Sequence, residues 1–287
     1  MPYKIRKINM KEYLLIVVII FTIIAGTNVS YSKRNDSDTL KLSNDLIVRK
    51  IEKDMYIVTH SFPWPANSLL CKLTSSDFIL IDTPWENNAT KLLVEWIKKN
   101  NSKMNLRVIN THFHRDNLGG NGYLLEQNIP VYGSDLTVRL LNEKLKDPNQ
   151  DNIADMLEQP KYKRYYEAFK KTELKPPNHT FKVNDGFKFE IGNEIVEIYY
   201  PGAGHTKDNI VVYFHLRKIL FGGCIVKALR WKGLGYTGDA DIKEWPHSLK
   251  KLSKKFPQSR IVIPGHGSWG DLSLIHHTLK LLRNNKD

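Results

Sequence analysis

The sequence predicts an α+β protein built as a four-layer αββα sandwich. Strand-like and helix-like apolar patterns alternate through both halves of the 287-residue chain. With 41% hydrophobic residues, the chain can bury a full core, as one domain or as two fused halves. Four predicted strands end in glycine-containing loops that carry histidine, aspartate or cysteine. These side chains are therefore expected together at one edge of the paired sheets.

The first 32 residues differ in kind from the rest. Four basic residues precede an apolar run at 14–25, which is too short for a membrane span of about 20 residues. Ser30 and Ser32 offer small residues near a cleavage point. We therefore predict a signal peptide over 1–32, a mature domain over 33–287 and a periplasmic or secreted location. An uncleaved anchor is the alternative.

The chain is strongly basic, with a formal net charge of +13 at pH 7. Residues 1–32 carry four basic residues and one acidic residue, so the mature chain keeps +10. No basic motif interleaved with aromatic residues stands out, and an exported protein rarely meets nucleic acid. We predict a lysine-rich solvated surface, no nucleic-acid partner, no stable membrane association after signal cleavage, and a monomer.

The mature chain begins with strand patterns at 46–51, 55–59, 67–73 and 78–81. Between the second and the third, Phe62-Pro63-Trp64-Pro65 predicts a stiff turn with apolar tips. One interpretation of Trp64 is that it simply packs against the body. An amphipathic helix follows, with its apolar residues expected on one face, namely Leu92, Leu93, Trp96 and Ile97.

Residues 111–120, Thr-His-Phe-His-Arg-Asp-Asn-Leu-Gly-Gly, follow a buried strand at 106–109. His112, His114 and Asp116 occupy alternate positions and can converge only where the chain leaves regular structure. Gly119 and Gly120 let the backbone curl behind them. Imidazole and carboxylate groups on one loop are typical of zinc sites, although this short motif also occurs by chance.

The centre of the chain continues with a helix at 118–127, a strand at 130–132 and a helix at 136–145. The segment at 146–178 is rich in charge. It nevertheless carries an aromatic stripe at helical spacing, which is more typical of core packing than of a binding site, consisting of Tyr162, Tyr165, Tyr166 and Phe169.

The last third repeats the strand-then-loop arrangement. A hairpin is predicted over 187–191 and 195–200, a strand pair over 210–214 and 219–221, and a strand at 261–263 between two helices. Each of three strands leads into a loop with one candidate ligand: His205, Cys224 and His266. The remaining histidines lack such loops and are interpreted as surface or packing residues, namely His60, His179, His215, His247, His276 and His277.

In the order and spacing of these six side chains, the sequence resembles the metallo-β-lactamase superfamily, and within it the zinc β-lactamases of subclass one. The likeness runs from about Asp45 to the C-terminus. It implies the metallo-β-lactamase fold and two zinc ions. The first zinc would be held by His112, His114 and His205, and the second by Asp116, Cys224 and His266.

The resemblance also implies roles for other residues. It places Asp82 behind the metals and assigns Asp116 and Lys227 to catalysis, with Lys227 binding the substrate carboxylate. Trp64 and Tyr236 become candidate substrate contacts, although many relatives carry asparagine where Tyr236 stands. Because a disulfide would consume a zinc ligand, both Cys71 and Cys224 are expected to be unpaired. The segment at 146–178 departs from the family and is expected to dock as an extra helix.

The implied function is a dizinc hydrolase that opens the β-lactam ring of penicillins, cephalosporins and carbapenems and so confers antibiotic resistance. Three alternatives within the superfamily are thioester hydrolases, lactonases and RNA-processing nucleases. Those typically carry a histidine after the motif aspartate and a bridging aspartate, where this chain has Asn117 and Cys224. An alternative of another class is a zinc-binding protein without catalysis.

Overall fold

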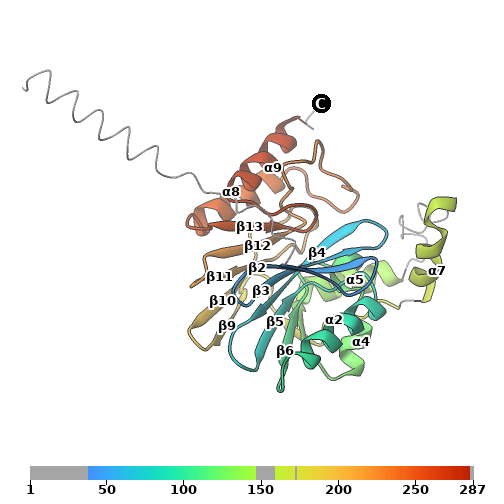
Figure 1. Ribbon diagram of the computed structural model, residues 1–287. Helices are drawn as coiled ribbons and strands as arrows, with labels where there is room; N and C mark the ends of the chain where they lie inside the picture. The colour runs from blue at the N-terminus through green and yellow to red at the C-terminus, as the bar shows by residue number, and fades with distance from the viewer. Residues whose placement is uncertain (1–37, 147–158, 172, 285–287) are drawn as a thin grey trace, which may run out of the picture. The chain divides into compact units, whose positions relative to one another are not determined.

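The computed structural model describes residues 38–146, 159–171 and 173–284. The predicted signal peptide lies outside these residues. Within them, no helix has both the length and the apolar character needed to cross a lipid bilayer. Strands and helices form two sheets that pack face to face, with helices on both outer sides (Figure 1). This arrangement confirms the predicted α+β sandwich of four layers.

The first sheet contains eight strands in chain order. The first five are antiparallel, and β6, β7 and β8 then continue the sheet in parallel with β5. These strands are β1 (Thr39–Lys41), β2 (Leu46–Glu52), β3 (Met55–Ser61), β4 (Pro65–Lys72), β5 (Asp77–Ile81), β6 (Asn105–Ile109), β7 (Val131–Ser134) and β8 (His179–Phe181).

The second sheet has the order β13-β12-β11-β10-β9 and ends in a parallel β12–β13 pair. Its strands are β9 (Phe187–Ile191), β10 (Glu194–Tyr199), β11 (Val211–Phe214), β12 (Ile219–Gly223) and β13 (Ile261–Pro264). The helices are α2 (Asn87–Lys99), α3 (Arg115–Leu118), α4 (Asn121–Glu126), α5 (Asp135–Leu145), α7 (Lys163–Lys171), α8 (Trp245–Lys255) and α9 (Ser273–Asn284).

Three apolar layers hold the sandwich together. Side chains of both sheets, such as Ile79 and Phe221, meet between them in the central layer. Residues of α2 and α4, including Leu93 and Leu124, cover the outer face of the first sheet. Residues of α8 and α9, including Leu249, cover the outer face of the second sheet. Because strand residues alternate between faces, β3, β4 and β5 contribute both to the central layer and to the layer beneath α2 and α4.

Two helix predictions need correction. The predicted helix at 118–127 begins later, as α4 at Asn121, and is preceded by the separate short helix α3. Between the two helices, Gly119 lies so close to Trp85 that a Cβ would be 2.0 Å from the Trp85 carbonyl oxygen. On α2, Leu92 was expected to be buried but is 39% exposed, while Leu93 and Ile97 are buried. The buried face is therefore centred one residue later than predicted.

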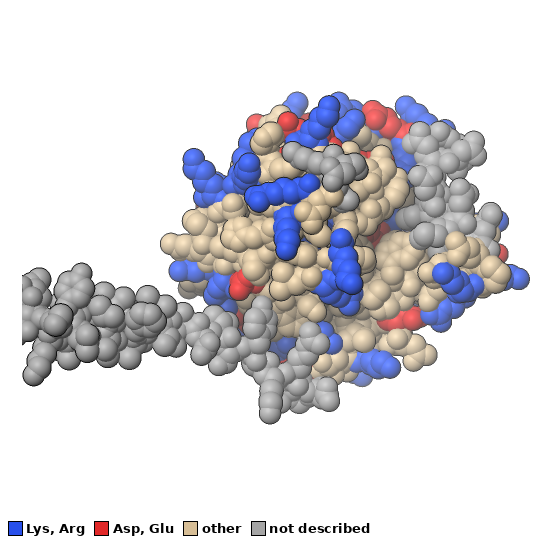
Figure 2. Space-filling model, turned by 90° about the horizontal axis from the view of Figure 1, so that it is seen from above, with Lys and Arg blue, Asp and Glu red and all other residues tan. Residues whose placement is uncertain are grey.

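The distribution of charged residues agrees with the predicted lysine-rich, solvated surface. On the face seen in Figure 2, Lys and Arg side chains are spread around uncharged areas, with few Asp and Glu among them. A single basic stripe is not visible on that face.

Both cysteines are unpaired, as expected, and both are buried. Burial raises the pKa of the Cys71 thiol to about 12.

The aromatic stripe of the segment at 146–178 lies on α7 and the 3₁₀ turn before it, Pro160–Tyr162. Tyr165 and Phe169 are buried against Ala66 and Trp85, so the predicted packing role of the stripe is confirmed for these two residues. Residues 147–158 and 172 lie outside the described part of the chain. Phe169 also stacks on Arg115, at 4.9 Å from the guanidinium carbon to the ring centroid. Helix α7 therefore contacts the loop of predicted ligands.

Candidate metal centre

The candidate site lies where several strands end at one edge of the sandwich. His112, His114 and Asp116 follow β6, and Cys224 follows β12. His266 follows β13, which runs parallel to β12 with Gly223 paired to Pro264. Backbone hydrogen bonds join these loops: Gly265 N donates to the Gly223 oxygen at 2.8 Å, and Ile210 N donates to the Thr111 oxygen at 3.0 Å.

The structure brings the six predicted ligands together in three overlapping groups. Within each group, the donor atoms lie within 4.8 Å of one another. The groups are His112, His205 and Cys224; His112, His114 and Asp116; and Asp116, Cys224 and His266. The last is the predicted second zinc set. In the predicted first set, the ring centroids lie 4.7 Å (His112–His114), 5.4 Å (His112–His205) and 5.1 Å (His114–His205) apart.

Asp116 connects the groups. Its Oδ2 lies 3.0 Å from His266 Nε2 and 3.7 Å from Cys224 Sγ. Burial alone would raise the pKa of Asp116, but the hydrogen bond and charge of His266 lower it below its usual range. The close approach of Gly265 is required here, because a Cβ at this position would lie 2.4 Å from Cys224 Sγ.

The donor set fits zinc, because imidazole, carboxylate and thiolate are the ligands that zinc takes in proteins. His112 adds a structural observation. Its Nδ1 lies 3.4 Å from Thr111 Oγ1, while its Nε2 is buried without a hydrogen-bond partner. A buried ring nitrogen without a partner destabilises a fold, and a metal ion bound there would remove that cost.

Asp82 lies behind the ligand loop, as the resemblance implied. Its carboxylate accepts hydrogen bonds from Thr111 N at 2.7 Å, Thr111 Oγ1 at 2.8 Å and Asn117 Nδ2 at 2.6 Å. Its backbone has a φ of 58°, which lets the chain turn sharply after β5. Complete burial raises the pKa of Asp82 well above its usual value, against the opposing effect of these hydrogen bonds.

Asp239 is a site residue that the sequence analysis missed. Its Oδ2 lies 2.8 Å from His114 Nε2 and 3.7 Å from Lys144 Nζ. A carboxylate at one ring nitrogen orients an imidazole and leaves the other nitrogen for a metal. The hydrogen bond of His114 lowers the pKa of Asp239, which keeps it charged. Asp239 lies on a loop without a recognisable motif, so the sequence offered no signal for it.

The three predicted substrate residues differ in their burial and in the side chains that they contact. Lys227 is 7% exposed, and its Nζ lies 5.3 Å from the centroid of the Trp245 ring. Burial lowers the pKa of Lys227, and the nearby Cys224 and Asp116 oppose that effect. Tyr236 is 44% exposed and its ring lies 5.8 Å from that of His114. Trp64 packs edge-on against Trp85 at 5.3 Å, which is the packing alternative. Their contacts with a substrate stay predictions.

Trp245 is a second residue near the site to which the sequence analysis gave no role there. Its buried ring lies 5.9 Å from that of His205, and its Nε1 donates to the Ile225 oxygen at 2.8 Å. Together with the contact to Lys227, these interactions join the loops of His205 and Cys224 to the beginning of α8.

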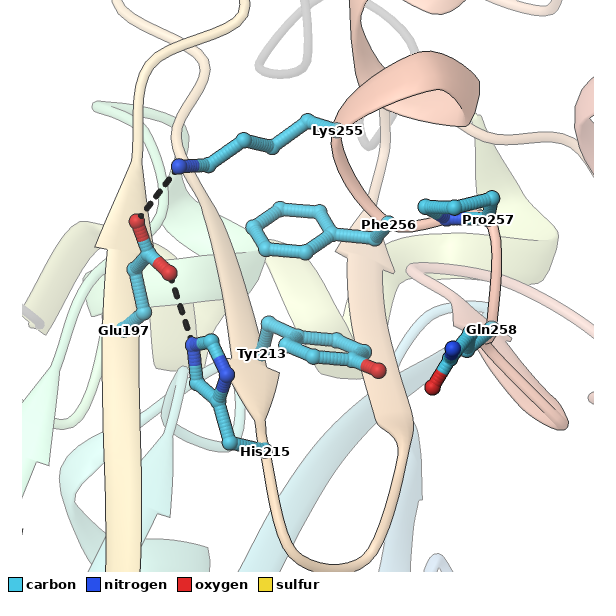
Figure 3. A pocket seen from close by; sticks show the side chains of 7 residues that line it. All are labelled: Glu197, Tyr213, His215, Lys255, Phe256, Pro257 and Gln258. Carbon is cyan, nitrogen blue, oxygen red and sulfur yellow. Dashed lines mark hydrogen bonds and ion pairs between the residues drawn. The ribbon is translucent and has the colours of Figure 1, made fainter.

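A shallow cavity of about 300 Å³ lies at the other end of α8, on the outer face of the second sheet. Figure 3 shows Glu197 between Lys255 and His215, beside the stacked rings of Tyr213 and Phe256. The Glu197 oxygens lie 3.1 Å from Lys255 Nζ and 2.7 Å from His215 Nε2. The polar groups of this cavity are thus paired with one another, and they are separate from the metal centre.

His60 is a buried packing residue, as the sequence analysis expected. Its Nδ1 accepts a hydrogen bond from Trp85 N at 3.1 Å, and burial lowers its pKa to about 3. In the unfolded chain the His60 imidazole takes up a proton near pH 6.5, whereas in the folded chain it does so only near pH 3. The contribution of His60 to stability is therefore full above pH 6.5 and falls by about 1.4 kcal/mol per pH unit as the pH drops between these values.

We expect His60→Gln, which cannot titrate, to reduce this acid sensitivity. The free energy of unfolding should be measured by urea denaturation at pH 7 and pH 5, with a chelator present in all samples. Between these pH values, the wild type should lose about 2 kcal/mol more than the variant, from the same slope. Equal losses in both proteins would show that His60 is not the group responsible.

Comparisons with known proteins agree with this geometry. Residues 62–266 match the family model described as the metallo-beta-lactamase superfamily. The metallo-beta-lactamase type 2 of Bacillus sp. (strain 170) is 32% identical over 255 residues, which cover 87% of this chain and 85% of that protein. The metallo-beta-lactamase type 2 of Bacillus cereus is 35% identical over 219 residues, covering 76% and 73%. A solved metallo-beta-lactamase from Pontibacter korlensis is 37% identical, with a TM-score of 0.69 and coverage of 84% and 100%.

Proposed function

This chain belongs to the metallo-β-lactamase superfamily, and from that membership we propose that it is a dizinc hydrolase that opens the β-lactam ring of penicillins, cephalosporins and carbapenems. The observation that carries the proposal is the convergence of six zinc-type donors in overlapping groups at one edge of the sandwich. In its host, such an activity would confer resistance to these antibiotics.

The proposed ligands are those of the sequence analysis. His112, His114 and His205 would hold the first zinc, and Asp116, Cys224 and His266 the second. Zinc bound there would supply a Lewis acid for the lactam carbonyl and a water whose pKa is lowered to about 7. The surrounding protein holds the donors in place: Asp239 orients His114, and Asp82 anchors the loop through Thr111 and Asn117.

We further propose that Lys227 binds the carboxylate that these drugs carry. It stands close to Cys224 and Asp116, so a substrate held by Lys227 would present its lactam to the second metal group. Tyr236 is exposed and its ring lies 5.8 Å from that of His114, and it is proposed to contact the substrate from the rim of the site. The basic N-terminal segment and apolar run support export of the protein to the periplasm or the exterior.

We expect hydrolysis to depend on zinc. Dialysis against a chelator should abolish carbapenem hydrolysis, and stoichiometric zinc should restore it, because the proposed attacking group is a water acidified by zinc and the side chains of the site serve as metal ligands. The assay is the loss of lactam absorbance over time. Retention of full activity in protein shown by mass spectrometry to be free of metal would contradict the proposal.

The same preparation separates this function from its superfamily alternatives. A carbapenem, a glutathione thioester and a lactone should be assayed side by side with zinc-loaded protein. We expect turnover of the carbapenem alone at an appreciable rate. Fast turnover of the thioester or lactone with an intact carbapenem would assign a different hydrolase activity. Tight zinc binding without any turnover would instead favour a non-catalytic zinc protein.

A further inference from the structure

The inserted helix α7 is docked through a cluster of aromatic residues that also includes the turn between β3 and β4. We call Phe62, Trp64, Trp85, Tyr165 and Phe169 the aromatic cluster. The ring of Phe62 lies 4.6 Å from that of Tyr165 and 5.7 Å from that of Phe169. Tyr165 and Phe169 are only 8% and 6% exposed, so the docking face of α7 is buried.

One side of the aromatic cluster leads to His266. Phe62 and Trp64 form the turn that ends at Pro65, and the Pro65 oxygen lies 2.7 Å from His266 Nδ1. Since a carbonyl oxygen only accepts, Nδ1 carries the proton and Nε2 faces Asp116. A hydrogen bond from the second ring nitrogen is the means by which proteins orient a histidine ligand. The position of this turn therefore sets the orientation of the His266 ring.

The other side of the aromatic cluster leads to Asp116. The Arg115 guanidinium carbon lies 4.9 Å from the centroid of the Phe169 ring, in the range of a cation–π contact. Arg115 is the first residue of α3 and stands between His114 and Asp116 in the chain. Phe169 thus restrains the short helix from which the Asp116 carboxylate projects.

Both routes end at the same metal group. His266 and Asp116 belong to the group completed by Cys224, and neither set of contacts involves His112 or His205. His114 precedes Arg115 in the chain, but its ring is held separately by Asp239, at 2.8 Å. We infer that the aromatic cluster is a positioning device for the second metal. It holds Asp116 and His266 at the separation that binding requires, and so makes the affinity of that site depend on α7. The inference rests on the proposed two-metal function.

A purely structural role for the aromatic cluster predicts something different. Loss of packing would lower the stability of the whole domain and weaken both metal groups together. A positioning role weakens the group of Asp116, Cys224 and His266 selectively. Cobalt(II) distinguishes the two, because a cobalt–thiolate absorption band arises only where Cys224 is a ligand, and of the two proposed metal sites only the second, with Asp116 and His266, includes Cys224.

The decisive variant is Phe169→Leu, which removes the ring over Arg115 and keeps most of the volume. Its matched control is Phe256→Leu, a buried phenylalanine stacked on Tyr213 at the distant cavity. Metal-free full-length proteins should be titrated with cobalt(II) in a metal buffer. We expect half-saturation of the thiolate band to require at least about tenfold more free cobalt in Phe169→Leu, the usual scale for residues that support ligands. The control and the ligand-field bands of the histidine group should be unchanged.

A second variant, Trp64→Leu, tests the contact of the turn with His266 through Pro65. It should also raise the free cobalt(II) concentration at which the thiolate band is half-saturated. It also serves as the test if Phe169→Leu does not fold. Wild-type affinity in a folded variant, or an equal shift in Phe256→Leu, would overturn the inference. Equal weakening of both metal groups would do the same. A wild type that binds one cobalt or shows no thiolate band would instead contradict the proposed function.

Discussion

Replacing Cys224 by alanine is expected to lower the zinc content of the purified protein from two ions per chain toward one. Cys224 supplies the thiolate of the second group, and its Sγ lies 3.7 Å from Asp116 Oδ2. The three histidines of the first group do not require it. Zinc per chain should be determined by mass spectrometry after dialysis at a buffered, limiting concentration of free zinc.

Cys71→Ala is the matched control, because Cys71 is also buried and unpaired but lies in the central apolar layer. This variant should lose stability without losing zinc, since removal of a buried side chain leaves a small cavity. Two tightly held zinc ions in Cys224→Ala would refute the ligand assignment. Loss of both ions together would show that the groups do not act as separate sites.

Lys227→Met should reduce kcat/KM for carboxylate-bearing β-lactams by about 10- to 100-fold, equivalent to roughly 1.4–2.7 kcal/mol of transition-state stabilisation. Methionine keeps the stem over the Trp245 ring and removes the charge that would bind the drug carboxylate. A carboxylate-free lactam should be affected much less. A glutamate at this buried position would also repel Asp116, so the neutral replacement isolates the effect on the substrate.

Lys232→Met provides the control, because Lys232 is exposed on the same loop. It should leave kcat/KM close to that of the wild type for every substrate. Zinc content must be measured for both variants, since the comparison is meaningful only with two ions bound. An equal loss for lactams with and without a carboxylate would assign Lys227 to the support of the fold rather than to the substrate.

The predicted ligands could be found from sequence because each lies a few residues after a strand with a clear apolar pattern. A strand's end determines where the next loop begins, and the parallel pairing of β12 with β13 brings Cys224 and His266 to one edge. Asp239 could not be found in this way. It reaches His114 across 125 residues of chain, and nothing in its local sequence distinguishes it from a solvated carboxylate.

The same limit applies to α7. The spacing of Tyr165 and Phe169 predicts a buried helix face, but periodicity contains no information about what covers that face. The contacts with Phe62 and Arg115 depend on the tertiary position of the segment. The gap between α3 and α4 was missed for a related reason. The apolar pattern does not show that Gly119 lies against the Trp85 backbone, which is a contact between distant parts of the chain.

The location of His266 on the loop after the last strand has a consequence for biosynthesis. Asp116 and His266 are separated by 150 residues (266 minus 116), so their metal group forms only after the chain has been synthesised as far as His266 and, if exported, translocated. Contacts between such distant residues form late and slowly during folding. A nascent chain can assemble His112, His114 and His205 first. Capture of the second metal then follows synthesis of the loop that carries His266 and reports that β13 has joined its sheet.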